Sequence, residues 1–337
     1  MQNLASFSFF RRIALLTTVL ALCVVVLGAY VRLSDAGLGC PDWPGCYGTL
    51  TVPESQSAIS HAQEAYPNKP VEAHKAWKEM AHRYVAGTLG LLVLSLCLLG
   101  WRAKRHISVS PWLPTALLFV IGFQAMLGMW TVTLLLKPLI VSSHLMGGMT
   151  TLAILTWIAH RHFGSHSKRI VESELVRFWI RSALLVIFAQ IFLGGWTSSN
   201  YAALACTDFP TCHGEWVPDM DFGTAFHWVR ELGQTAAGKP LELSAFTAIQ
   251  WTHRVGAMVT FIYLGALSIM LIKNERLKSF GVILCILLFI QISLGIGNLV
   301  LHLPLALAVG HNMGAALLLI TIVVINSKIT ELSKRNY

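Results

Sequence analysis

The sequence predicts an all-α polytopic membrane protein whose eight transmembrane helices form two repeat-related four-helix bundles. Three observations support this fold class. The 337 residues are 55% hydrophobic and only 12% charged, and that charged fraction is about half the value for soluble domains. Several uncharged runs are long enough to cross roughly 30 Å of hydrocarbon. Distinctive motifs recur about 167 residues apart. The composition excludes a soluble α/β enzyme, a disordered chain and a small disulfide-stabilised protein.

The uncharged runs define the expected spans, which should be helical because lipid satisfies no backbone hydrogen bonds. In chain order the runs are Ile13–Val31, Tyr84–Trp101, Pro111–Leu136, Pro138–His160, Ser182–Ser198, Val255–Ile272 and the charge-free stretch Ser279–Ser327. We expect the second and sixth helices to begin before their runs, the second near Lys75. The last stretch is too long for one span, and His302-Leu303-Pro304 divides it into two.

The distribution of Lys and Arg predicts the orientation. Arg11 and Arg12 precede the first run, which is too long for a signal peptide, so we expect it to remain as a span. With the N-terminus inside, most of the 25 Lys and Arg residues fall on the inner side, in agreement with the positive-inside rule. Both termini are then cytoplasmic, and the net charge of +9 does not require nucleic acid as a partner. Because no Arg-rich amphipathic leader is present, we expect a bacterial inner membrane.

An internal repeat divides the chain into an N-terminal half, residues 1–170, and a C-terminal half, residues 171–337. The matching features are His82-Arg83 with His253-Arg254, Gln124-x-x-Leu127-Gly128 with Gln291-x-x-Leu294-Gly295, His144 with His311, and Cys40/Cys46 with Cys206/Cys212. Each half has four expected spans, so both halves share one orientation and are related by an axis along the membrane normal. Each half also has one long outer loop, at residues 34–74 and 200–245.

Four of the 13 histidines lie inside expected spans, namely His82, His144, His253 and His311. All four lie roughly 10 Å from the outer end of their helices at 1.5 Å per residue. A single histidine in a span often only forms a hydrogen bond to a neighbouring helix. That role does not readily explain four histidines at equal depth. Two facing imidazoles are typical axial ligands of haem iron, whereas zinc takes three or four ligands at one point. We therefore predict two haem sites, one in each half, near the outer side.

The first outer loop carries the most specific motif. The stretch LGAYVRLSDAGLGCPDWPGC, from Leu27 to Cys46, strongly resembles the signature of haem A synthases. The other residues that resemble this family are Glu79, His82, Arg83, His144, Gln250, His253, Arg254 and His311. The resemblance covers essentially the whole chain. It implies oxidation of the C8 methyl of haem O to the formyl of haem A in two successive hydroxylations.

The same resemblance implies where the haems lie and what the protein works with. Haem O would bind as substrate to the iron ligands His82 and His144 of the N-terminal half. Haem b would be a resident cofactor on His253 and His311 of the C-terminal half. Haem O synthase, a farnesyltransferase, would be the donor, and the assembly of haem–copper oxidases would be the recipient of haem A. An electron acceptor is also needed.

The two halves differ at one position that bears on mechanism. Glu79 lies three residues before His82, on the same helix face, whereas Gln250 lies three residues before His253. Two axial histidines leave no open position on the iron for O₂, so we expect electrons to leave the porphyrin edge and water to attack the oxidised methyl. Glu79 would be the base or the electrostatic partner of the developing charge. The alternative is an interfacial carboxylate stabilised by a nearby lysine.

Two kinds of residue near the expected haem sites need interpretation. The pairs Cys40/Cys46 and Cys206/Cys212 face an oxidising compartment, so we expect one disulfide within each loop. A structural role is the simpler interpretation, and thiol exchange with a periplasmic oxidoreductase is the alternative.

Two arginines lie beside the expected haem sites. Arg83 and Arg254 directly follow two expected iron ligands. A buried guanidinium needs an anion, and haem propionates are available. We therefore include both arginines among the expected haem-binding residues.

Two other functions remain open at this point. A di-haem b-type electron-transfer cytochrome would use the same four histidines without oxidising a methyl group. Glu79, with its neutral counterpart Gln250, and the cysteine loops favour the synthase. A transporter would also suit repeated halves, but the expected helices lack polar breaks near the midplane.

Overall fold

The computed structural model describes residues 2–104, 109–163 and 170–330. Eight helices in this part are long and apolar enough to cross a membrane, as predicted. Their bounds are α1 (Gln2–Leu33), α3 (Ala73–Arg102), α4 (Trp112–Thr133), α5 (Pro138–Phe163), α6 (Glu174–Ser199), α8 (Leu243–Ile272), α9 (Lys278–Val300) and α10 (Leu305–Lys328). The chain ends at residues 1 and 331–337, for which we expect a cytoplasmic position, lie outside the described residues. The all-α membrane fold class is thus confirmed.

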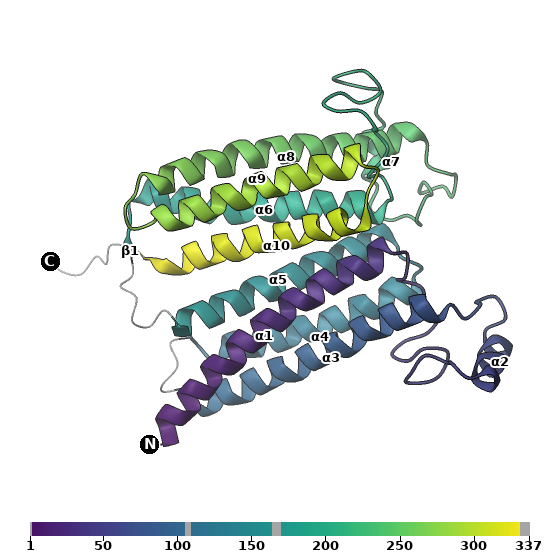
Figure 1. The fold of residues 1–337 in the computed structure, drawn as a ribbon, viewed down its shortest axis with the longest axis horizontal. Helices are drawn as coiled ribbons and strands as arrows, with labels where there is room; N and C mark the ends of the chain where they lie inside the picture. The colour runs from purple at the N-terminus through teal and green to yellow at the C-terminus, as the bar shows by residue number, and fades with distance from the viewer. Residues whose placement is uncertain (1, 105–108, 164–169, 331–337) are drawn as a thin grey trace.

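The remaining elements are short. Helix α2 (Gln56–Ala65) lies in the connection between α1 and α3, and α7 (Phe222–Ala225) lies in the connection between α6 and α8. Strands β1 (Ile170–Val171) and β2 (Ile329–Thr330) form one parallel pair. In Figure 1, α2 and α7 lie at the opposite end of the molecule from the start of α1. The two long connections are therefore on the same side.

Two tight turns show how the sequence ends one helix and begins the next. After α4, Leu135 and Leu136 have φ values of 50° and 59°, and the Leu136 N–H bonds to the Thr131 carbonyl. This six-to-one bond is the helix C-terminal arrangement of a Schellman motif. The turn after α9 has the same form at His302 and Leu303. Proline begins the next helix in the first case and precedes it in the second, since its fixed φ suits a first helical turn.

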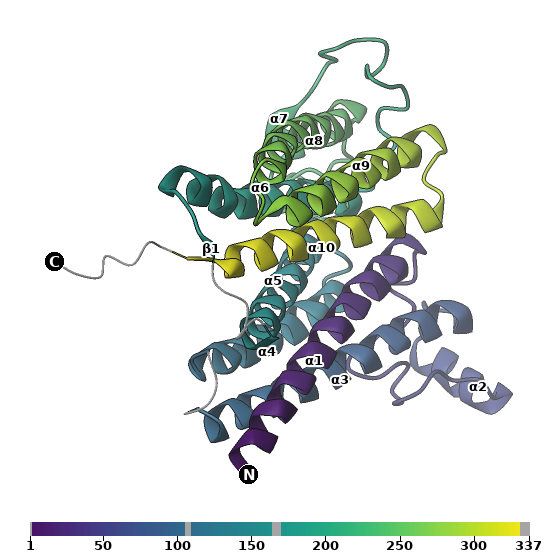
Figure 2. The same cartoon turned by 60° about the vertical axis from the view of Figure 1, so that its left-hand side comes forward.

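The helices pack as two rings of four (Figures 1 and 2). In the first ring α1 packs on α3, α3 on α4, α4 on α5 and α5 on α1. In the second ring α6 packs on α8, α8 on α9, α9 on α10 and α10 on α6. The rings meet where α10 contacts α1 and α5, and where α5 contacts α6. Half of the most apolar segment of α10 is buried, the largest share among the eight helices, because α10 lies between the two rings.

The outward faces of the rings are apolar. Phe119 on α4, Leu185 on α6 and Phe289 on α9 are each more than 70% exposed. In a soluble protein such side chains would form a large exposed apolar surface, but facing lipid they need no further cover. The buried apolar cluster runs through both rings, from Phe10 to Ile329.

Candidate haem site

Each ring holds one pair of the predicted histidines on helices that face each other across the ring. His82 lies on α3 and His144 on α5, and in the described part of the chain these two helices are not among the packed neighbours of the first ring. His253 on α8 and His311 on α10 have the same relation in the second ring. Each ring of helices therefore contains one of the two predicted histidine pairs, and the binding of a haem between them stays a prediction.

A glycine of a third helix lies against each imidazole. A Cβ added at Gly28 on α1 would lie 3.0 Å from Cε1 of His82, and one at Gly128 on α4 would lie 3.3 Å from Cε1 of His144. In the second ring, Gly194 and Gly295 have the same relation to His253 and His311, at 3.1 and 3.0 Å. Because glycine has no Cβ atom, each imidazole fits against the neighbouring helix. Each of these four glycines directly follows a leucine.

These residues fit haem better than a metal ion bound by side chains alone. Each ring offers two imidazoles on facing helices, which is the donor set of a bis-histidine haem. In the first ring, His82 and His144 each have a buried Nδ1 atom without a hydrogen-bond partner among the described residues, so this ring keeps polar capacity that the protein does not use. His253 and His311 are the residues that would hold a haem in the second ring.

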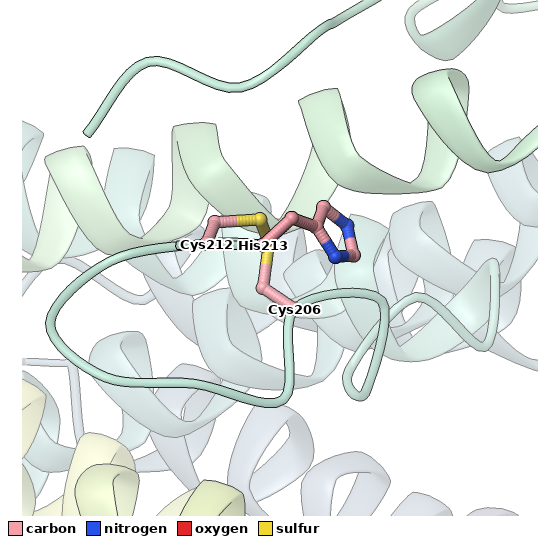
Figure 3. A group of neighbouring side chains, drawn as sticks. All are labelled: Cys206, Cys212 and His213. Atoms are coloured by element: carbon pink, nitrogen blue, oxygen red, sulfur yellow. A yellow bond between two sulfur atoms is a disulfide. The ribbon is translucent and has the colours of Figure 1, made fainter. Parts of the chain in front are cut away.

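One other group of side chains could be mistaken for a metal site. Among the described residues, only Cys206, Cys212 and His213 bring three potential ligand atoms within 4.8 Å of one another (Figure 3). The two sulfur atoms are joined in a disulfide, so neither is a thiolate that could bind a metal. We therefore assign no metal to this group.

The predicted disulfides are confirmed within their own loops. Cys40 is bonded to Cys46, and Cys206 to Cys212. All four residues are essentially fully buried. This burial favours a structural role over thiol exchange, because an exchange partner must reach a sulfur atom.

Each disulfide loop is closed by an aspartate. Asp42 accepts hydrogen bonds from the backbone N–H groups of Tyr47 and Gly48. Asp208 does the same for His213 and Gly214. The Thr211 hydroxyl also donates to Asp208 at 2.7 Å. This bond and the backbone bonds hold the pKa of Asp208 well below its usual range.

Glu79 connects the first pair of histidines to the first disulfide loop. Its side chain is 6% exposed. One carboxylate oxygen accepts from the Cys40 N–H at 3.0 Å, and the other lies 2.5 Å from Nη2 of Arg83. Gln250 occupies the same place in the second ring, where its side-chain oxygen accepts from the Cys206 N–H. A neutral amide can therefore hold the loop as well as a carboxylate does, so the charge of Glu79 is not needed for that contact.

The two arginines that follow the histidines also contact the loops. Arg83 donates through Nη1 to the carbonyl oxygens of Asp42 at 3.0 Å and of Gly45. Arg254 donates to the carbonyl oxygens of Thr211 and Cys206, both at 2.8 Å. These bonds were not expected from the sequence. Contact of either guanidinium with a haem propionate stays a prediction.

Comparison with known proteins is in agreement with this geometry. The model of a family described as cytochrome oxidase assembly protein matches residues 11–323. The chain belongs to this family. It is 46% identical to the haem A synthase of Shewanella oneidensis, over 92% of this chain and 94% of the relative. It is 28% identical to the haem A synthase of Caulobacter vibrioides, over 88% and 89%, and 26% identical to that of Halalkalibacterium halodurans, over 77% and 86%.

In this cytochrome oxidase assembly protein, Gln190 is a site residue that sequence reasoning missed. Its Nε2 lies 3.0 Å from Nδ1 of His253. A signal was present, because Gln190-x-x-Leu193-Gly194 on α6 repeats the motif already noted at Gln124 and Gln291. The internal repeat does not reveal this third copy, because the residue 166 positions before Gln190 is Val24 and not a glutamine.

Proposed function

We propose that this chain is a haem A synthase, which oxidises the C8 methyl of haem O to the formyl of haem A in two successive hydroxylations. The observation that carries the proposal is the 46% identity to a haem A synthase over nearly the full length of both chains. The two pairs of facing histidines support it, because a haem substrate and a resident haem need two separate sites. In the balanced net reaction, one methyl group and one water molecule give one formyl group, four protons and four electrons.

The N-terminal half, residues 1–170, would bind the substrate, and the C-terminal half, residues 171–337, would hold haem b. His82 and His144 are the ligands for the haem O iron, and His253 and His311 those for haem b. The difference between Glu79 and Gln250 supports this assignment, because only the N-terminal half has an ionisable side chain one turn from a histidine pair. When bound, haem b supplies one-electron transfer toward an external acceptor.

Glu79 would accept protons at its carboxylate during the oxidation. It lies one turn from His82 on α3 and is buried, so it can act where water is scarce. The guanidinium of Arg83 compensates its charge at 2.5 Å. The Cys40 N–H fixes the second oxygen, so the carboxylate is held in one orientation.

The cellular setting follows from the charges, the disulfides and the family. We infer a bacterial inner membrane with both termini in the cytoplasm and the haem sites near the periplasmic side. The two disulfide loops, which need an oxidising compartment, lie at the end of the helices that carries the histidines. Haem O synthase would hand over the substrate, and haem–copper oxidase assembly would receive the product.

A conversion assay tests this function. The chain is produced in cells that make haem O but have no haem A synthase of their own, and the pigments are extracted and separated. Haem A should appear with the wild type and not with His82→Ala present at the same level in the membrane. If haem O persists unchanged with the wild type, the proposed activity is wrong. Haem B alone in the purified protein would indicate an electron-transfer cytochrome.

A further inference from the structure

We propose that Gln190 is a positioning residue that fixes the His253 imidazole, and that Val24, at the matching place on α1, leaves His82 free to release its haem. The proposal rests on the proposed function, since it requires a haem on each pair of histidines. It adds a physical reason why one haem stays and the other is exchanged.

Four helices present a glycine to a histidine, and three of them also carry a glutamine four residues earlier. The three motifs are Gln124-x-x-Leu127-Gly128 on α4, Gln190-x-x-Leu193-Gly194 on α6 and Gln291-x-x-Leu294-Gly295 on α9. On α1 the same register reads Val24-Val-Val-Leu27-Gly28. Because Gly28 contacts its histidine as the other three glycines do, the alignment is fixed by structure. Val24 therefore replaces a glutamine.

The glycine that each glutamine contacts is also missing at the matching position on α3. The side-chain oxygens of Gln124, Gln190 and Gln291 lie against Gly147, Gly256 and Gly314, so closely that a Cβ there would be under 3.0 Å away. Each of these glycines is three residues after the histidine of its helix. On α3 the residue three after His82 is Val85. At His82 the two positions that correspond to this glutamine and glycine are both occupied by valine.

The consequence is visible at the imidazoles. In the second ring, the side-chain Nε2 of Gln190 lies 3.0 Å from Nδ1 of His253. The Nδ1 of His311 lies 3.2 Å from the backbone carbonyl oxygen of Gln291, a contact that does not depend on the glutamine side chain. In the first ring the buried Nδ1 atoms of His82 and His144 have no partner among the described residues. Gln124 and Gln190 both donate to the backbone carbonyl of the histidine on the neighbouring helix, and only Gln190 also contacts an Nδ1 atom.

Such contacts decide how firmly a histidine holds iron. An iron-bound imidazole donates its other N–H to an acceptor, which fixes the ring, and loss of that acceptor typically lowers metal affinity about 10–100-fold. A glutamine amide can turn its oxygen toward this N–H, but valine offers no acceptor. Both ligands are held in the C-terminal half, where haem b must stay. In the N-terminal half, from which the product must leave, neither Nδ1 has such a contact, although Gln124 lies beside His144. The valines therefore account for His82 alone.

Purified variants with their native haems test the proposal without an activity measurement. Gln190→Val should speed loss of haem b to an apomyoglobin acceptor by about tenfold or more, and should shift its ferric electron paramagnetic resonance signal and its midpoint potential. Gln190→Glu retains an acceptor oxygen and should restore slow loss. Gln124→Val, the matched control, should leave haem b loss within about twofold, since Gln124 touches no Nδ1.

The reciprocal variant should gain the missing contact. Val24→Gln with Val85→Gly gives His82 the glutamine and glycine that Gln190 and Gly256 provide at His253. If the new amide reaches Nδ1 as Gln190 does, haem O or haem A should leave the protein about tenfold more slowly. If Gln190→Val keeps haem b as firmly as the wild type with an unchanged resonance signal, the positioning role is wrong. If the double variant releases haem O at the wild-type rate, the role of Val24 is wrong. A wild type that contains no haem would instead refute the proposed function.

Discussion

The carboxylate of Glu79 and the backbone N–H of Cys40 are joined by a hydrogen bond of 3.0 Å. The residue expected to act on the substrate therefore also holds the first disulfide loop above the histidines. In the second ring Gln250 makes the same contact with Cys206. The two rings therefore distinguish the two roles of Glu79. Both rings have the contact with the disulfide loop, but only the first ring has a negative charge at this position.

Replacing Glu79 with glutamine should therefore remove the charge and keep the loop. Haem O should still bind, since His82 and His144 are unchanged. Conversion to haem A should fall about 10²-fold or more, the usual loss for a general base. Pigment extraction after a timed reaction measures both quantities. Haem A formed at the wild-type rate would mean that Glu79 only holds the loop. The opposite change, Gln250→Glu, should not create activity in the C-terminal half.

Retention of haem O should depend on the space beside each imidazole as well as on its ligand nitrogen. A Cβ at Gly128 would lie 3.3 Å from the His144 ring, whereas one at Gly122 on the same helix meets nothing within 4 Å. Gly128→Ala should turn the imidazole and lower haem O retention about tenfold, the scale of losing a ligand-orienting contact. Gly122→Ala should retain haem O as the wild type does. Because alanine favours the helix in both variants, equal loss in both would show that the effect is not local.

The second disulfide loop should depend on pH only in strongly acidic solution. The bonds from Thr211, Gly214 and His213 lower the pKa of Asp208 in the folded protein. A lowered folded pKa stabilises the loop above the unfolded value of about 3.9, and that stabilisation is lost as the pH falls toward the folded pKa. Hydrogen-exchange protection of the Gly214 amide should stay constant from about pH 7 to pH 5 after correction for intrinsic rates.

The matched variant for that experiment is Asp208→Ala. It removes the acceptor of the Gly214 N–H, so exchange should be about tenfold faster across the same pH range. Protection in the wild type that falls between pH 7 and pH 5 would contradict the lowered pKa of Asp208.

Much of the fold could be predicted because membrane-spanning helices are recognised by long runs without charged residues. The uncharged runs predicted the eight spans, and α3 and α8 begin before their runs, as expected. The pairing of His82 with His144 was also predictable, since equal depth and repeat spacing constrain it. The two-residue pair of β1 and β2 had no such signal, because its partners are far apart in sequence and short.

The contacts of the site residues were harder to predict. Arg83 follows His82 directly, but a position along a helix does not say whether its guanidinium meets a haem propionate or a loop carbonyl such as that of Asp42, 41 residues earlier. Gln190 was missed because its meaning depends on two other helices, one carrying His253 and one carrying the repeated motif. Periodicity within one segment contains no information about such three-way contacts.

The most direct measurement is the haem inventory of the purified protein and of two ligand variants, obtained by extraction and by absorption spectra. The wild type should contain haem B together with haem O or haem A. His82→Met should lose haem O and haem A and keep the haem b spectrum, while His253→Met should change that spectrum and keep haem O. Haem B alone in the wild type would contradict the synthase, and a haem b spectrum unchanged in His253→Met while haem O falls would reverse the two sites.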